Sequence, residues 1–119
     1  MVIDSVRFGS LTISGKRYRQ VLIVEDKVFE RDFEKLQQTF GTTHKIGGWE
    51  IKKLFETNPE IIVVGTGWQG ELDPGQDLGN QAKEKGIEFA VLPTPKAVEF
   101  FNEKVEQGKK VNALIHTTC

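Results

Sequence analysis

One short segment constrains the fold of this chain more than any other: the apolar run Ile61–Val64, which leads directly into the glycine-rich segment Gly65–Gly70. An unbroken apolar run of this length between turn signals is typical of a central parallel strand that is buried on both faces. Parallel strands are joined by crossovers that pack helices onto the sheet. The segment therefore predicts an α/β fold with strand 61–64 inside the sheet.

The glycine-rich segment reads Gly-Thr-Gly-Trp-Gln-Gly, which matches the G-x-G-x-x-G pattern of dinucleotide-binding turns. That pattern requires a helix to open at the third glycine, so that the helix N-terminus faces the pyrophosphate. Here the helix signals come later, with Asp73 as N-cap and Pro74 as first helical residue. The end of the next strand, 90–93, also lacks the carboxylate that would bind the ribose. We interpret the segment as a tight turn and expect no cofactor.

Periodicity and turn residues divide the rest of the chain into strands and helices. Residues 1–30 alternate apolar and polar side chains in short bursts, which predicts β-hairpins. Phe29, Phe33, Leu36 and Phe40 are spaced for one face of a helix that ends at Gly41. The elements expected after it are a helix at 49–55, strand 61–64, a helix over about 75–85, strand 87–92, a helix opening at Thr94 as N-cap with Pro95, and strand 111–115. No repeat or linker interrupts this order, so residues 1–119 are predicted to form a single domain.

The charge balance and the cysteine content exclude several classes of function. Sixteen Lys and Arg against 17 Asp and Glu leave a net charge of −1, so no basic excess exists for a nucleic-acid partner. The densest basic stretch, 16–19, is interpreted as a solvated hairpin turn. Cys119 is the only cysteine, which excludes an internal disulfide and a cysteine-rich zinc site. With no apolar run of membrane-spanning length, and with Asp4 near the start, we expect a cytoplasmic chain without a membrane partner.

Two loops are expected to meet at one edge of the sheet. In α/β folds ligands collect outside the carboxyl ends of the strands, where segments 65–70 and 92–95 lie. Both precede helix N-termini in the predicted order, so both would direct backbone N–H groups to one rim. If the last strand is also parallel, it delivers His116 to the same rim. Trp68 either folds back onto the sheet or stays exposed as a contact residue. The candidate binding residues are Gly65, Thr66, Gly67, Trp68, Pro93, Thr94 and His116.

Several short segments, taken in order, resemble one known family. They are Gly65-Thr66-Gly67 after a strand, Leu92-Pro93-Thr94, Ala97, Phe101-Asn102, Gly108, the final Ile115–Cys119, and His44-Lys45-Ile46 before Glu50-Ile51. The chain resembles the archaeal and bacterial single-domain members of a small α/β family of unknown function. That family includes an adipogenesis-associated human protein and a mitochondrial complex I assembly factor.

The resemblance implies a single-domain three-layer fold, with a central mixed sheet flanked by helices and an N-terminal β-hairpin region. It implies no established catalytic activity and no cofactor. A mitochondrial assembly role is an analogy only, because nothing in the chain signals mitochondrial targeting.

His116 is also the centre of the candidate chemistry. The pair His116-x-x-Cys119 has a spacing seen in metal sites, but only one further histidine, His44, exists to help close a tetrahedral shell. We therefore expect no metal. A Cys119–His116 nucleophile would need a fixed geometry, which a frayed final residue does not supply. We predict no catalytic residue and lean against an enzyme.

Two functions of different classes remain open. The first is a non-enzymatic protein-binding or assembly-helper domain that contacts an unknown protein partner through the rim. The second is a binder of a small molecule or small anion, with or without catalysis, that uses the same rim and His116. We favour the first because no acid–base or nucleophile constellation is evident. A closed concave pocket at the rim would favour the second function, and an exposed flat patch the first.

Overall fold

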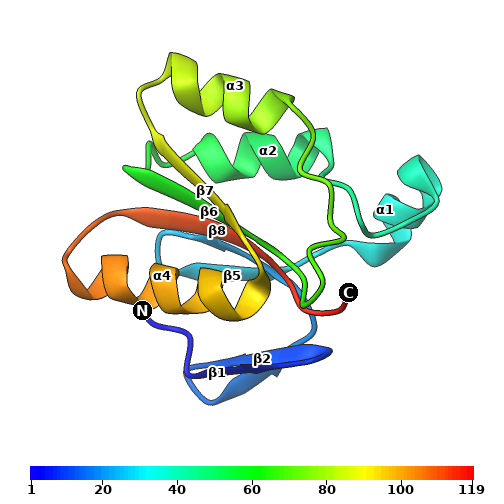
Figure 1. Ribbon diagram of the computed structural model, residues 1–119, viewed down its shortest axis with the longest axis horizontal. Coiled ribbons are helices and arrows are strands. Elements are labelled where there is room, and N and C mark those ends of the chain that lie inside the picture. Colours follow the sequence, from blue (N-terminus) through cyan, green and yellow to red (C-terminus); the bar gives the residue numbers. More distant parts are fainter.

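The computed structural model describes residues 1–119 and arranges them as eight strands and four helices (Figure 1). The strands are β1 (Ser5–Arg7), β2 (Ser10–Ile13), β3 (Lys16–Tyr18), β4 (Val21–Val24), β5 (Lys27–Glu30), β6 (Ile61–Thr66), β7 (Glu88–Leu92) and β8 (Val111–His116). The helices are α1 (Phe33–Phe40), α2 (Gly48–Phe55), α3 (Asp77–Glu84) and α4 (Thr94–Glu106). The first helix starts only at Phe33, since Phe29 lies in β5. None of the four helices has both the length and the apolar character needed to cross a bilayer.

A five-stranded mixed sheet forms the middle of the molecule, with the strand order β5-β4-β8-β6-β7. β6 pairs in parallel with both β7 and β8, whereas β4 runs antiparallel to β8 and to β5. All six residues of β6 are buried, as its unbroken apolar run predicts for a strand covered on both faces. Because α3 and α4 carry the chain back between parallel strands, β6, β7 and β8 end at the same edge of the sheet.

Two layers cover this sheet on opposite sides (Figure 1). α2 and α3 lie on one face, and α4 lies on the other together with a small antiparallel sheet of order β1-β2-β3. Nine buried apolar residues, among them Leu54 and Ile62, form the core of the first side, and 13, among them Leu11 and Phe101, form that of the second. The arrangement confirms the three-layer α/β fold with an N-terminal β-hairpin region.

The segment after the glycine turn differs from the prediction. Asp73 and Pro74 do not open a helix. The Oδ1 atom of Asp73 accepts the N–H of Gly75 at 2.9 Å, and the Asp73 N–H donates to the carbonyl of His44 at 2.9 Å. These contacts hold the backbone in a turn against a distant segment, so α3 begins only at Asp77.

Candidate functional site

The two predicted loops lie side by side at the carboxyl edge of the parallel strands. The hydroxyl of Thr66 donates to the carbonyl of Leu92 at 3.2 Å. The N–H of Thr94 donates to the carbonyl of Gly67 at 3.0 Å, and the N–H of Gly67 donates to the hydroxyl of Thr94 at 2.8 Å. The expectation that segments 65–70 and 92–95 meet at one rim is therefore confirmed.

Thr94 joins strand ends instead of capping a helix. Pro93 occupies the N-cap position of α4, and no side chain caps this helix. The buried Thr94 hydroxyl accepts the N–H of Gly67 and donates to the carbonyl of His116. The capping prediction is thus wrong, because the hydroxyl finds partners on β8 and on the loop after β6. Gly65 allows this approach, since a Cβ there would lie 3.1 Å from the Thr94 hydroxyl.

The segment that follows β8 fills the glycine turn. The N–H of Trp68 donates to the carbonyl of Thr118 at 2.8 Å. The N–H groups of Gln69 and Glu71 both donate to the carbonyl oxygen of Cys119, at 3.1 and 3.0 Å. A Cβ at Gly67 would lie 2.4 Å from the carbonyl carbon of Cys119. The backbone donors that an anion would need at this turn are therefore already bonded to the chain itself.

His116 reaches the rim with its backbone, while its ring points into the molecule. β8 is parallel to β6 and pairs Thr66 with His116, as the right-handed crossover predicts. The imidazole is fully buried: Nδ1 lies 3.0 Å from Oε1 of Gln20, and Nε2 lies 3.2 Å from the hydroxyl of Thr118. The ring of His44 meets it edge-on, with 4.9 Å between ring centroids. A ligand at the rim surface therefore does not meet the ring of His116.

Burial also determines the charge of this histidine. Removal of the ring from water, together with the nearby charges of Arg31 and His44, lowers the pKa of His116 from 6.5 to about 4. His116 is therefore neutral at neutral pH. No third His, Cys, Asp or Glu joins the two histidines to form a metal-binding group.

Sequence reasoning missed the charged cluster beneath the rim. The buried guanidinium of Arg31 is bonded bidentately to Glu50, with Nε–Oε2 at 2.8 Å and Nη2–Oε1 at 2.9 Å. Its remaining hydrogens are donated to Oε1 of Gln20 at 2.9 Å and to the carbonyls of Thr43 at 3.0 Å and Lys45 at 2.7 Å. All five donors of the guanidinium are thus satisfied. Because Gln20 also contacts the ring of His116, the cluster links the residue that follows β5 to α2 and β8.

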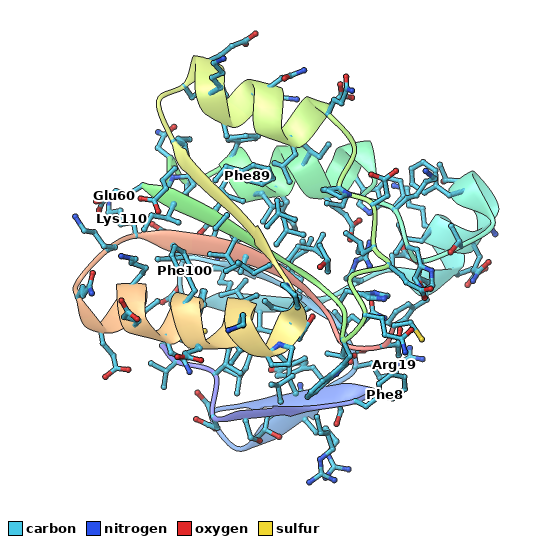
Figure 2. The ribbon with its side chains drawn as sticks, in the orientation of Figure 1. Phe8, Arg19, Glu60, Phe89, Phe100 and Lys110 are labelled. Atoms are coloured by element: carbon cyan, nitrogen blue, oxygen red, sulfur yellow. The ribbon has the colours of Figure 1, made fainter.

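Two large aromatic side chains remain exposed around the end of β8. Phe8 is 59% exposed and Trp68 is 39% exposed. Gly9, the residue after Phe8, donates its N–H to the carbonyl of Thr117 at 2.9 Å, and Trp68 donates its N–H to the carbonyl of Thr118. Thr117 in turn donates its hydroxyl to the carbonyl of Arg19 at 2.5 Å. Figure 2 shows Phe8 and Arg19 next to each other at this end of the small sheet. We call the surface formed by Phe8, Trp68 and segment 117–118 the aromatic rim.

The main hollows of the surface lie away from this rim. A hollow of 390 Å³ lies at the other end of the parallel strands and is lined by residues that include Asp26, Lys110 and Asn112. A second, of 480 Å³, lies along α4 between Glu99 and Gln107. None of the main hollows is lined by Phe8, by segment 117–118 or by a residue of segment 65–70, and the one that Leu92 lines runs along α4. The aromatic rim is therefore an open surface, the shape that favours contact with another macromolecule.

The family model for a protein of unknown function, DUF498/DUF598, matches residues 3–116 of the chain. The chain belongs to this family. Among solved structures, MT938 is 33% identical over 99% of this chain and 98% of its own, with a TM-score of 0.81. A conserved hypothetical protein from Pyrococcus horikoshii OT3 is 29% identical over the whole of both chains, with a TM-score of 0.85. A Bartonella henselae protein, described as an outer membrane protein, is 20% identical over 98% of this chain and 94% of its own (TM-score 0.78), a likeness of fold alone.

These findings confirm the resemblance to a small family of unknown function. The link to the adipogenesis-associated protein and to complex I assembly stays a prediction.

The buried histidine makes the stability of this DUF498/DUF598 domain depend on pH. Between pH 6.5 and about 4 the unfolded chain binds a proton at His116 that the folded chain does not, so stability falls as the pH drops through this window. We expect the free energy of unfolding to fall by about 2 kcal/mol from about pH 7.5 to about pH 5. Urea titrations across this range measure it. The His116→Asn variant is expected to lose most of the slope, and an equal slope in both proteins would contradict the burial of a neutral imidazole.

Proposed function

We propose that this family member is a non-enzymatic protein-binding domain, of the kind that helps a partner to assemble. Its contact surface is the aromatic rim together with the adjoining segments 65–70 and 92–95. The observation that carries the proposal is the exposure of Phe8, in the turn after β1, and of Trp68, in the loop after β6. Both loops are held beside segment 117–118 by a backbone hydrogen bond, from Gly9 and from Trp68 itself. Aromatic side chains are enriched among the residues that dominate binding energy at protein interfaces.

The rigidity of the rim supports this function. Trp68 lies in a turn whose N–H groups are bonded to Thr118 and Cys119, and whose carbonyl at Gly67 is bonded to Thr94. A surface that is already ordered loses little conformational entropy when a partner binds, so more of the contact energy appears as affinity. The backbone that carries Trp68 is thus ordered before a partner binds.

The small-anion alternative has weaker support. An anion at the glycine turn would compete with the carbonyl oxygens of Thr118 and Cys119 for the N–H groups of Trp68, Gln69 and Glu71. The hydroxyl of Thr94 and the ring of His116, which an enzyme at this rim would use, are buried and bonded within the protein. An exposed nucleophile beside an accessible base would be needed for acyl or group transfer here.

Alanine substitution of the two anchors tests the proposal. We expect the Phe8→Ala/Trp68→Ala variant to capture its principal partner from a lysate of the source cells at least about tenfold less well than the unchanged chain, since one aromatic anchor contributes about 2 kcal/mol or more. Quantitative mass spectrometry of the bound proteins measures the ratio. The Phe40→Ala variant is the matched control, because Phe40 is 37% exposed but stacks on Trp49 at another place. Should every captured protein bind all three chains equally, the proposal is wrong.

A further inference from the structure

Positive charge is concentrated in one part of this nearly neutral chain. Residues 5–24 contain four basic residues and no acidic residue, whereas the whole chain contains 16 basic and 17 acidic residues. The four are Arg7, Lys16, Arg17 and Arg19, all of them exposed. The three ion pairs of the molecule involve none of these four. The small sheet is therefore a cationic module on an otherwise acidic protein.

The register of the small sheet puts two of these arginines on its outer face. Leu11 and Ile13 of β2 are buried in the core, so their strand neighbours Ser10 and Thr12 face outward. Arg7 is paired with Ser10, and Arg17 is paired with Thr12. Ser5, the other partner of Thr12, adds a third hydroxyl to the same face.

This outer face continues into the aromatic rim. Phe8 follows Arg7 directly. Arg19 lies two residues after Arg17, at the end of the small sheet where Phe8 lies (Figure 2). The guanidinium carbon of Arg19 lies 4.1 Å from the centroid of the Phe33 ring, which holds its charge at that end. Two cations thus lie on the outer face of the small sheet, and a third lies at the end of the sheet that carries the exposed ring of Phe8.

We propose that the outer face of β1-β2-β3 binds an acidic segment of the partner polypeptide, whose carboxylates pair with Arg7 and Arg17 while an adjacent apolar side chain contacts Phe8. Guanidinium groups suit this task because they bind carboxylates bidentately, and hydroxyls donate further hydrogen bonds to the same oxygens. The inference deepens the proposed function and rests on it, since Phe8 belongs to both surfaces.

The size of the cationic face favours a polypeptide over a nucleic acid. Its strands are only three or four residues long, so it covers a few carboxylates and not a continuous phosphate backbone. Acidic residues outnumber basic ones over the rest of the chain, and a polyanion that extended beyond the face would be repelled there.

Direct binding to the unmodified chain tests the proposal. The probe is a synthetic peptide of glutamates around a single phenylalanine. Its binding is measured by fluorescence anisotropy of the peptide and by ¹⁵N amide shifts of the protein. The same peptide with glutamines in place of the glutamates is the reference. We expect shifts at Arg7, Ser10, Thr12 and Arg17, and binding that weakens as sodium chloride is raised from about 0.05 M to about 0.3 M. The Arg7→Gln/Arg17→Gln variant is expected to bind at least about tenfold more weakly.

The matched control is Lys52→Gln/Lys83→Gln, which removes two exposed charges from α2 and α3 on the other side of the main sheet. Any of four results would overturn the proposal. Both variants could bind the acidic peptide equally weakly, or the glutamine peptide could bind as well as the acidic one. The amide shifts could be confined to other surfaces, or an oligothymidylate could bind more tightly than the acidic peptide. The lysate experiment distinguishes the acidic-segment proposal from the proposed protein-binding function. A partner lost by Phe8→Ala/Trp68→Ala but retained by Arg7→Gln/Arg17→Gln would overturn the acidic segment and leave the protein-binding rim in place.

Discussion

The Glu50→Gln variant is expected to lose about 3–5 kcal/mol of unfolding free energy. Glu50 and Arg31 are both buried, and the carboxylate accepts two hydrogen bonds from the guanidinium and one from the N–H of Gly47 at 2.9 Å. Glutamine keeps the size of the side chain but removes its charge. Its amide NH₂ group is a donor, and it takes the place of a carboxylate oxygen that accepts N–H groups of Arg31. The guanidinium charge is then buried without a counter-charge, which is the costly state of a broken internal ion pair.

Urea unfolding followed by tryptophan fluorescence measures this loss. The same substitution at Glu99, an exposed residue of α4, is the control and should leave the midpoint almost unchanged. The paired variant Arg31→Met/Glu50→Leu should recover much of the stability lost in Glu50→Gln, because it removes both charges together. A loss below about 1 kcal/mol in Glu50→Gln would mean that water reaches the pair and that the cluster is not closed.

The second large effect is expected at Gly67. Its φ is +102°, and a Cβ there would lie within 2.4 to 2.7 Å of the backbone atoms of Thr118 and Cys119. The Gly67→Ala variant must therefore push segment 118–119 away and weaken the hydrogen bonds that Trp68, Gln69 and Glu71 donate to it. Backbone strain and the lost hydrogen bonds together should cost about 2–4 kcal/mol.

Gly70 supplies the comparison within the same turn. Its φ is +71°, but a Cβ there would meet only the Thr66 hydroxyl, at 3.7 Å, so Gly70→Ala carries the backbone cost of about 1–2 kcal/mol without the collision. Thermal unfolding gives the two stabilities, and amide hydrogen exchange at Trp68 and Gln69 should accelerate in Gly67→Ala alone. If the two alanine variants behave alike, segment 118–119 is not packed into the turn.

Local sequence patterns predicted the fold correctly where a single strand or crossover determines the structure. The apolar run 61–64 had to be a strand covered on both faces, and β6 is an inner strand between β8 and β7 with all its residues buried. Helical crossovers on both sides of β7 then brought segments 65–70 and 92–95 to one edge. Local signals failed at Asp73 and Thr94, whose side chains resemble helix caps but bond to Gly75 and to the strand ends. A cap pattern describes what a side chain can do, and tertiary neighbours decide which option is used.

By itself the sequence determined the order of strands and helices, the inner position of β6 and the meeting of two loops at one rim, because these follow from periodicity and from the geometry of crossovers. Only the tertiary structure decided that Arg31, Glu50 and the ring of His116 are buried together, and that segment 118–119 occupies the glycine turn. Arg31 stands between two acidic residues, where a charged side chain is normally solvated, and nothing next to Glu50 in the sequence marks it as one half of a buried ion pair. Their burial depends on β5, α2 and β8 converging from distant parts of the chain, and no local pattern of residues encodes that convergence.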